Sequence, residues 1–233
     1  MDGRVALITG ASRGIGAAVA RRFAAEGATL VLVARTTGGL EEIDDEIREI
    51  SGQRATLVPL DLTDFGAIDN LGAALHERFG RLDALVGNAG LLGTLGPIGH
   101  MDPEAWDQVM AVNLTANWRL IRSFDPLLRQ SDAGRAVFVT STVGHVARAY
   151  WSVYSVSKAA LEMMVQIYAA EVSETNVRVN LLNPGPTRTD MRARAYPGED
   201  PDSVKTPDHL SDAFVELCQA ACEKNGETVD CRD

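Results

Sequence analysis

Two side chains four residues apart, Tyr154 and Lys158, form the pair in this sequence best suited to acid–base chemistry. On a helix, this spacing gives about 6 Å of rise and puts both side chains on one face. A free tyrosine has a pKa of about 10, which is too high for proton transfer at neutral pH. An ammonium group ~4 Å away, at an effective dielectric of about 20, stabilises the phenolate by at most about 4 kcal/mol, or roughly three pKa units. We therefore expect Tyr154 to act as a general acid/base whose pKa is lowered by Lys158.

Two further polar residues could join this pair, Ser141 and Asn113. Ser141 follows a strand-like run thirteen residues before Tyr154, where its hydroxyl could hold a substrate carbonyl oxygen beside the phenol. Asn113 lies inside a long helical pattern, and a buried asparagine there must find hydrogen-bond partners. It could kink the helix and bind a water molecule leading to Lys158, or it could be a satisfied polar residue without a catalytic role. The predicted catalytic set is Asn113, Ser141, Tyr154 and Lys158.

A glycine-rich turn follows the first strand-like run, with Gly10, Gly14 and Gly16 spaced as Gly-x3-Gly-x-Gly. Glycines let the chain turn tightly and let backbone N–H groups approach a pyrophosphate, and the helix that follows points the positive end of its dipole at that anion. Because the turn follows a strand and opens a helix, it indicates a dinucleotide site. A plain βα turn is the alternative. The residues assigned to the turn are Gly10, Ser12, Arg13, Gly14, Ile15 and Gly16.

The second strand-like run ends in Ala34-Arg35, at the place where an acidic residue would accept hydrogen bonds from an adenosine ribose. An arginine cannot accept them, but it can pair bidentately with a 2′-phosphate. Arg13 could approach the same phosphate from the other side. The sequence therefore favours NADP(H) over NAD(H), the alternative being that Arg35 is a solvated surface residue.

Polar and small residues follow three other strand-like runs, at the sheet edge where ligands bind in open α/β folds. Asp61 could accept from an adenine amino group, or it could cap the next helix. Small residues after the fourth run let the chain pass close to a ligand, and the Pro/Gly segment after the sixth run could meet a nicotinamide. These segments add the following residues to the predicted cofactor site: Asp61, Leu62, Asn88, Ala89, Gly90, Pro184, Gly185, Thr187 and Thr189.

Strand-like and helix-like runs alternate along the chain, which predicts a parallel sheet with helices on both faces. The strand runs are almost entirely apolar, as in strands buried on both faces. We therefore predict a three-layer, doubly wound α/β fold in one domain, residues 1–233. The predicted strands are Val5–Thr9, Thr29–Ala34, Ala55–Leu60, Leu82–Gly87, Arg135–Thr140, Val177–Leu182 and a possible Glu227–Asp230. The predicted helices are Ile15–Glu26, Gly39–Ile50, Ala67–Phe79, Pro103–Phe124, Val153–Glu171 and His209–Cys222.

Residues 187–207 break this rhythm, because they are rich in proline, glycine and charge without a clear period. Irregular stretches of this length are often lids, so we predict a substrate-side loop here. Its basic residues could recognise a carboxylate or a phosphate-bearing acyl carrier. Interleaved acidic residues make a solvated charged loop the alternative. The basic residues are Arg188, Arg192, Arg194 and Lys205.

Composition limits the partners. Basic residues number 22 and acidic residues 32, and the net charge of −10 argues against nucleic acid or an anionic membrane as the main partner. The sequence shows neither a membrane-length apolar run nor a secretory signal. Three cysteines give no disulfide framework and favour a reducing, cytoplasmic compartment. Cys218, Cys222 and His209 could form a metal site, but we interpret the cysteines as small hydrophobes and predict no metal.

Together these motifs resemble the short-chain dehydrogenase/reductase family, in its single-domain branch, over about residues 3–230. TGASRGIG, NAG, the Asn113 segment, Ser141, Tyr154-x3-Lys158 and Pro184-Gly185 occur in the family's order. The 188–207 segment is similar to a bacterial subgroup whose members carry only the general label of oxidoreductase. The resemblance implies a Rossmann-type fold and hydride transfer between a nicotinamide and a small carbonyl or alcohol. It also implies that Tyr154 is the acid/base, Lys158 holds the nicotinamide ribose, Ser141 positions the carbonyl and Asn113 anchors a relay water.

The resemblance further implies a homodimer or homotetramer built from the Asn113 and Tyr154 helices. Two departures stand out. The chain ends in TVDCRD where many relatives have an Asp-Gly-Gly turn, which leaves the pairing of the last strand open, and residues 190–207 are short for a lid, which suggests an open pocket. Three functions remain: a general NADP(H)-dependent carbonyl reductase, a 3-oxoacyl-thioester reductase, and a catalytically silent nicotinamide-nucleotide sensor.

Overall fold

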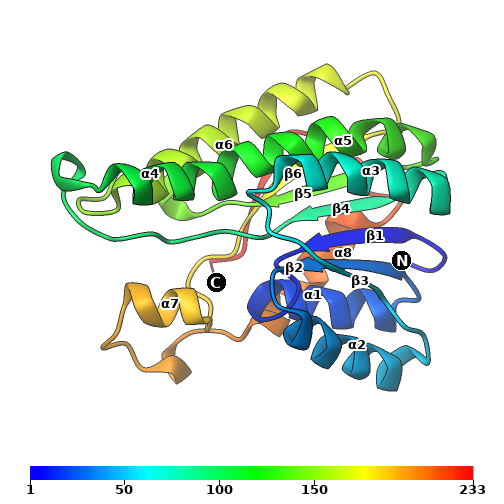
Figure 1. The fold of residues 1–233 in the computed structure, drawn as a ribbon, viewed down its shortest axis with the longest axis horizontal. Helices are drawn as coiled ribbons and strands as arrows, with labels where there is room; N and C mark the ends of the chain where they lie inside the picture. Colours follow the sequence, from blue (N-terminus) through cyan, green and yellow to red (C-terminus); the bar gives the residue numbers. More distant parts are fainter. Residues whose placement is uncertain (233) are drawn as a thin grey trace.

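The computed structural model describes residues 1–232 and has a seven-stranded parallel sheet between two layers of helices (Figure 1). The strand order is β3-β2-β1-β4-β5-β6-β7. This arrangement confirms the predicted three-layer α/β fold. The strands are β1 (Val5–Thr9), β2 (Thr29–Ala34), β3 (Thr56–Pro59), β4 (Ala84–Gly87), β5 (Arg135–Val139), β6 (Arg178–Asn183) and β7 (Thr228–Asp230).

Helices cover both faces of the sheet (Figure 1), and each face has its own apolar core between the strands and the helices. On one face lie α3 (Phe65–Phe79), α4 (Pro103–Met110), α5 (Ala116–Gln130) and α6 (Ser152–Glu171). On the other lie α1 (Gly14–Ala25), α2 (Thr37–Ser51) and α8 (Ser211–Cys218). The short helix α7 (Asp190–Ala195) lies apart from both layers, near the C-terminal end of the chain. Within residues 1–232, no helix is long and apolar enough to cross a bilayer.

The strand order reverses at β1, which pairs with β2 on one side and β4 on the other. All the strands run parallel, so their carboxyl ends share one edge, and the crossovers diverge there to leave a crevice. β1 is buried at all five residues because it lies in the centre of the sheet with helices on both faces. The segments that follow β1, β4, β5 and β6 therefore meet at one edge.

Three predicted segments differ from the structure. The helix predicted over Pro103–Phe124 is interrupted by a π-helical turn, Ala111–Thr115, which contains Asn113. The helix predicted over His209–Cys222 ends at Cys218 and is preceded by a 3₁₀ turn, Pro207–Leu210. Residues 187–207 are not wholly irregular, because Thr189 caps α7 by accepting from Arg192 N at 3.2 Å. A capped helix of six residues is too short to show a period in sequence.

The last strand pairs parallel with β6, with Thr228 opposite Leu181 and Asp230 opposite Asn183. The side chain of Asn180 fixes the segment just before this strand. It donates to Lys224 O at 2.8 Å and accepts from Glu227 N at 3.1 Å. The strand therefore joins the sheet edge without an Asp-Gly-Gly turn.

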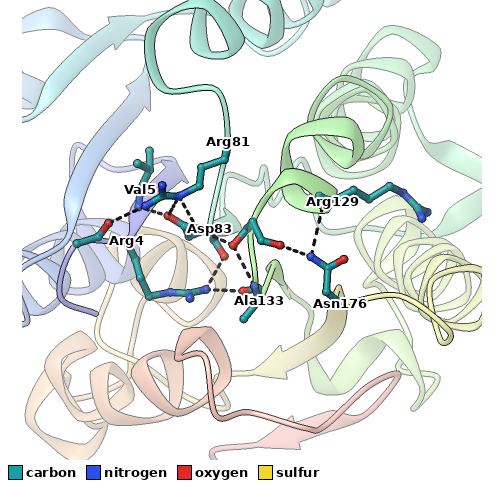
Figure 2. Close-up of polar contacts among 9 residues, drawn as sticks. Arg4, Val5, Arg81, Asp83, Arg129, Ala133 and Asn176 are labelled. Atoms are coloured by element: carbon teal, nitrogen blue, oxygen red, sulfur yellow. Dashed lines mark hydrogen bonds and ion pairs between the residues drawn. The ribbon is translucent and has the colours of Figure 1, made fainter.

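A buried carboxylate, Asp83, ties together the opposite, amino end of the sheet (Figure 2). It accepts hydrogen bonds from Val5 N at 2.7 Å and from Ser131 Oγ at 2.5 Å. Arg81 Nε donates to the same carboxylate at 3.1 Å, and Arg4 donates to the Asp83 carbonyl at 2.8 Å. This network joins β1, β4 and the segment before β5, far from the edge where the predicted site residues gather.

Candidate active site

A cavity of about 1070 Å³ runs along the carboxyl edge of the sheet. The structure brings most of the predicted site residues to its wall, from segments up to about 180 positions apart in the chain. Gly16 and Asn113 are the two predicted residues that do not line it. The lining members are Gly10, Ser12, Arg13, Gly14, Ile15, Arg35, Asp61, Leu62, Asn88, Ala89, Gly90, Ser141, Tyr154, Lys158, Pro184, Gly185, Thr187 and Thr189.

The glycine turn is packed so tightly that side chains cannot enter it. A Cβ atom at Gly16 would lie 2.3 Å from Gly10 O and 2.7 Å from Asn88 Nδ2, and one at Gly10 would lie 2.9 Å from Asn88 Nδ2. Gly16 is therefore a packing residue beneath the turn. Among the described residues, no side chain caps the N-terminus of α1, so its first N–H groups remain donors for a bound anion. This cradle fits a dinucleotide pyrophosphate.

Asn88 braces the same turn together with Thr9, a residue that sequence reasoning missed. Asn88 Nδ2 donates to Thr9 O at 2.9 Å. The buried Thr9 hydroxyl accepts from Asn88 N at 3.0 Å and from Ala89 N at 3.1 Å. A threonine as the last residue of an otherwise apolar strand was the available signal, because a buried hydroxyl needs partners.

Arg35 and Asp61 follow the neighbouring strands β2 and β3, and both line the cavity. Hydrogen bonds from the backbone N–H and hydroxyl of Thr63 lower the pKa of Asp61, and the nearby positive charge of Arg35 adds to this effect. The cap of α3 is Asp64, which accepts from Ala67 N at 3.0 Å. The alternative interpretation of Asp61 as a helix cap is therefore wrong.

Ser141, Tyr154 and Lys158 form the polar centre of the cavity. Tyr154 and Lys158 are only 7% and 3% exposed, and Ser141 forms a hydrogen bond with the Tyr154 phenol. Burial raises the pKa of Tyr154 to about 12, against the lowering effect of the Ser141 hydrogen bond. Burial lowers the pKa of Lys158 to about 8, while the negative charge of Glu162 opposes that change.

The expected lowering of the phenol pKa by Lys158 is absent from this structure. Lys158 Nζ lies 5.9 Å from the centre of the Tyr154 ring and donates instead to Val139 O at 2.7 Å. Burial raises the pKa of the phenol by removing water from the phenolate, and an ammonium group that is bonded elsewhere does not offset this effect. Glu162, one helical turn after Lys158, is the acidic neighbour whose charge raises the Lys158 pKa, and its i+4 spacing could have indicated this.

Asn113 is fully buried, and its side chain is hydrogen-bonded to other groups of the protein. Its Oδ1 accepts from Leu91 N at 2.7 Å, and its Nδ2 donates to Leu91 O at 2.9 Å and to Ser157 Oγ at 3.0 Å. A Cβ atom on Gly90 would lie 3.4 Å from Asn113 Oδ1 and 3.7 Å from Lys158 Nζ. Asn113 thus fixes the loop after β4 against α6, close to Lys158. Its role with a relay water stays a prediction.

Charged residues of the 187–207 segment pair mostly with one another. Arg188 contacts Asp202 at 2.7 Å, and Arg192 forms two bonds to Glu199, at 2.6 and 2.5 Å. At its start, Asp190 pairs with Arg13 of the glycine turn at 3.0 Å. These contacts favour the solvated, internally neutralised loop over a dedicated anion site.

The cysteines do not form a metal site in the part of the chain that the structure describes. Cys218 and Cys222 are buried and free, and His209 Nδ1 hydrogen-bonds Thr206 Oγ1 at 2.9 Å. No group of three or more His, Cys, Asp or Glu residues within residues 1–232 is placed to hold a metal ion. Burial raises the pKa of Cys218 to about 12, which makes its thiol unreactive at neutral pH.

A doubly wound parallel sheet, a glycine turn at its switch point and a Ser–Tyr–Lys cluster in one cavity define a dinucleotide-binding type of oxidoreductase. Comparison with known proteins agrees, since the family model described as short chain dehydrogenase matches residues 4–200. The chain therefore belongs to the short-chain dehydrogenase family.

Several relatives span nearly the whole chain. An uncharacterised oxidoreductase of Escherichia coli K12, YciK, is 39% identical over 233 residues, which cover 99% of this chain and 92% of YciK. A short chain dehydrogenase from Shigella flexneri, solved in complex with NADP, superposes with a TM-score of 0.96 at 38% identity and covers 100% of this chain and 98% of its own. One from E. coli CFT073, in complex with NADPH, gives 0.95 at 39% identity, covering 100% and 98%.

Proposed function

We propose that this protein is an NADP(H)-dependent oxidoreductase that interconverts a small carbonyl compound and an alcohol, with Tyr154 as general acid/base. The observation that carries the proposal is the cluster of Ser141 with the buried Tyr154 and Lys158, which shares one cavity with the glycine turn and Arg35. Proton transfer and nucleotide binding are thus available within a single site.

The cofactor site follows the cavity from β2 to α6. The glycine turn and the start of α1 receive the pyrophosphate, and Arg35 with Arg13 receives the 2′-phosphate. Asp61 and Leu62 border the adenine, and Lys158 holds the nicotinamide ribose. The NADP and NADPH complexes of the Shigella and E. coli relatives support this assignment. The nicotinamide side is assigned to Asn88, Ala89, Gly90, Pro184, Gly185, Thr187 and Thr189.

The chain's own residues handle the substrate oxygen and its proton. The bound nicotinamide supplies the hydride for reduction and accepts it in the reverse direction. The hydroxyls of Ser141 and Tyr154 bind the carbonyl oxygen, and Tyr154 donates its proton as negative charge develops there. Burial raises the pKa of the phenol to about 12, so it carries the proton that reduction requires at neutral pH. Lys158 serves this step by holding the nicotinamide ribose, since its ammonium donates to Val139 O and not to the phenol.

The two other functions have less support. A 3-oxoacyl-thioester reductase needs cations for its phosphate-bearing carrier, but Arg188 and Arg192 are already paired with carboxylates. A silent nucleotide sensor does not need a buried phenol hydrogen-bonded to a serine beside a buried lysine. The general carbonyl reductase is therefore the proposal we adopt.

We also propose that the protein is a homo-oligomer built through α5 and α6. Large apolar side chains are exposed on these helices, namely Trp118 at 46%, Val156 at 38%, Met163 at 58% and Ile167 at 52%. Exposed apolar groups of this kind mark interaction surfaces, and self-association through a two-fold axis is the commonest way to cover them. Light scattering of the protein and of a Met163→Glu, Ile167→Glu variant tests this, since a wild-type monomer contradicts it.

The proposed activity is tested by NADPH consumption across a panel of ketones, aldehydes, quinones and 3-oxoacyl thioesters. Tyr154→Phe is expected to lower kcat by about 10²- to 10⁴-fold while NADPH binding, followed by fluorescence, is retained. Full activity in that variant excludes the role given to Tyr154. Tight NADPH binding by the wild type without turnover of any panel member favours the sensor.

A further inference from the structure

Backbone strain flanks one residue of the cavity wall, Trp151. Its neighbours Tyr150 and Ser152 have φ angles of +71° and +21°, which residues with a side chain rarely adopt. Gly96 clamps both neighbours: Ser152 Oγ donates to Gly96 O at 2.7 Å, and Gly96 N donates to Tyr150 O at 2.9 Å. Strain that a structure holds in this way is concentrated at ligand sites, so the orientation of Trp151 calls for a functional reason.

The strained segment places the indole ring between the proton donor and α7. The Trp151 ring centre lies 5.9 Å from that of Tyr154 and 5.9 Å from that of Tyr196, the residue that ends α7. The guanidinium of Arg148 lies 5.9 Å from the Trp151 ring and forms a hydrogen bond with the Tyr196 hydroxyl. The indole is therefore fixed from two sides, while it still lines the cavity.

The surroundings of Trp151 on this side of the cavity are apolar. Leu92 is buried there beside Tyr154, and Met191 and Ala195 of α7 pack against the same cluster. Of the two arginines of α7 that line the cavity, Arg192 is neutralised by Glu199, and Arg194 is exposed, where solvent screens its charge. The guanidinium of Arg148 lies beside the indole but is not part of the cavity lining, so a charged substrate group placed against this wall loses hydration and gains little in return.

We propose that Trp151 is the specificity-determining residue of the carbonyl site, and that the site takes an uncharged, ring-bearing ketone. This inference rests on the proposed function and adds its substrate class. With the ketone oxygen at Ser141 and Tyr154, an attached ring lies within reach of the indole, whose centre is 5.9 Å from the phenol ring. Aromatic faces bind planar rings through buried area and preferred stacking geometry. A small linear ketone covers little of this wall.

The first test compares two uncharged ketones with NADPH, bicyclic 2-tetralone and linear 2,3-butanedione. Trp151→Ala is expected to lower kcat/KM for 2-tetralone by roughly tenfold to a hundredfold, mainly through KM, and to change that for 2,3-butanedione less than about threefold. Trp151→Phe, which keeps a ring, is expected to restore most of the loss. Trp106→Phe on α4, outside the cavity lining, is the matched control.

A second measurement separates this inference from the proposed function. Calorimetry of 2-tetralone binding to NADPH-loaded Tyr154→Phe protein needs no turnover, and adding Trp151→Ala is expected to weaken that binding by a similar factor. Binding that depends on Trp151, together with no turnover by the wild type, upholds the ring site and overturns the reductase. Equal losses for both ketones, no dependence of binding on Trp151, or a wild-type preference for anionic acetoacetate over 2-tetralone overturns the inference.

Discussion

The ammonium group of Lys158 donates a 2.7 Å hydrogen bond to the backbone carbonyl of Val139, the last residue of β5. Ser141 lies two residues further along the same segment and is hydrogen-bonded to the Tyr154 phenol. The end of β5 therefore holds both members of the α6 pair, one through its main chain and the other through a side chain. Because this pair is buried, the pKa of Tyr154 is raised and that of Lys158 is lowered, so the two groups titrate at different pH values from exposed ones.

Carbonyl reduction is expected to lose efficiency above a pH of about 8. The pKa of Lys158 is lowered to about 8, so its ammonium loses its proton as the pH rises through that value, whereas Tyr154, with a pKa of about 12, stays protonated. A pH profile of kcat/KM should be flat near neutrality and fall on the alkaline side. Lys158→Arg keeps its charge at that pH, so its residual activity should lack this fall. A wild-type profile that stays flat to pH 10 contradicts the assignment.

Arg35→Asp is expected to exchange the cofactor preference. Removing charge-assisted bonds to a 2′-phosphate should weaken NADPH binding by roughly tenfold to a hundredfold. The new carboxylate can accept from a ribose 2′-hydroxyl, so NADH binding should improve. Dissociation constants for both nucleotides, measured by fluorescence, check this. Arg48→Asp makes the same charge change on α2, outside the cavity lining, and should shift neither constant; equal shifts for both nucleotides would falsify the role of Arg35.

Asp190→Asn is expected to strengthen NADPH binding. Asp190 pairs with Arg13 at 3.0 Å, and both side chains are 70% exposed, so this pair is weak and competes with a phosphate for the same guanidinium. Its loss should lower the NADPH dissociation constant about twofold to fivefold at low salt, and less at high salt. Asp202→Asn, which breaks the Arg188 pair instead, is the control. An equal gain for NADH shows that the effect does not involve the 2′-phosphate.

Asp83→Ala is expected to destabilise the fold by about 3–5 kcal/mol, because it leaves Val5 N, Ser131 Oγ and part of Arg81 without their buried acceptor (Figure 2). Urea unfolding followed by circular dichroism measures the change. Asp132→Ala removes an exposed carboxylate from the neighbouring segment and should cost less than about 0.5 kcal/mol. A small effect at Asp83 means that water replaces the carboxylate.

Several features of the site could not be predicted because they arise between segments far apart in the chain. The pattern around Asn113 did not indicate its partners, because Leu91 and Ser157 lie 22 and 44 positions away in the chain. The arginines after β6 could belong to an anion-binding site or to a solvated loop, and the difference depends on partners such as Glu199, which only the folded chain shows. The role of Thr9 depends on N–H groups of Asn88 and Ala89, which follow β4 and are about 80 positions away in the chain.

Local sequence features are enough to predict the alternation of strands and helices, the glycine turn, Arg35 after a strand and the Tyr154–Lys158 spacing. These features depend on local periodicity, steric limits and side-chain chemistry, which neighbouring residues already express. The packing of distant segments is what makes Lys158 bond Val139, raises the Tyr154 pKa to about 12 by burial, and places Trp151 beside the phenol. Desolvation and through-space contacts depend on which distant segments pack together, and a linear pattern does not contain that information.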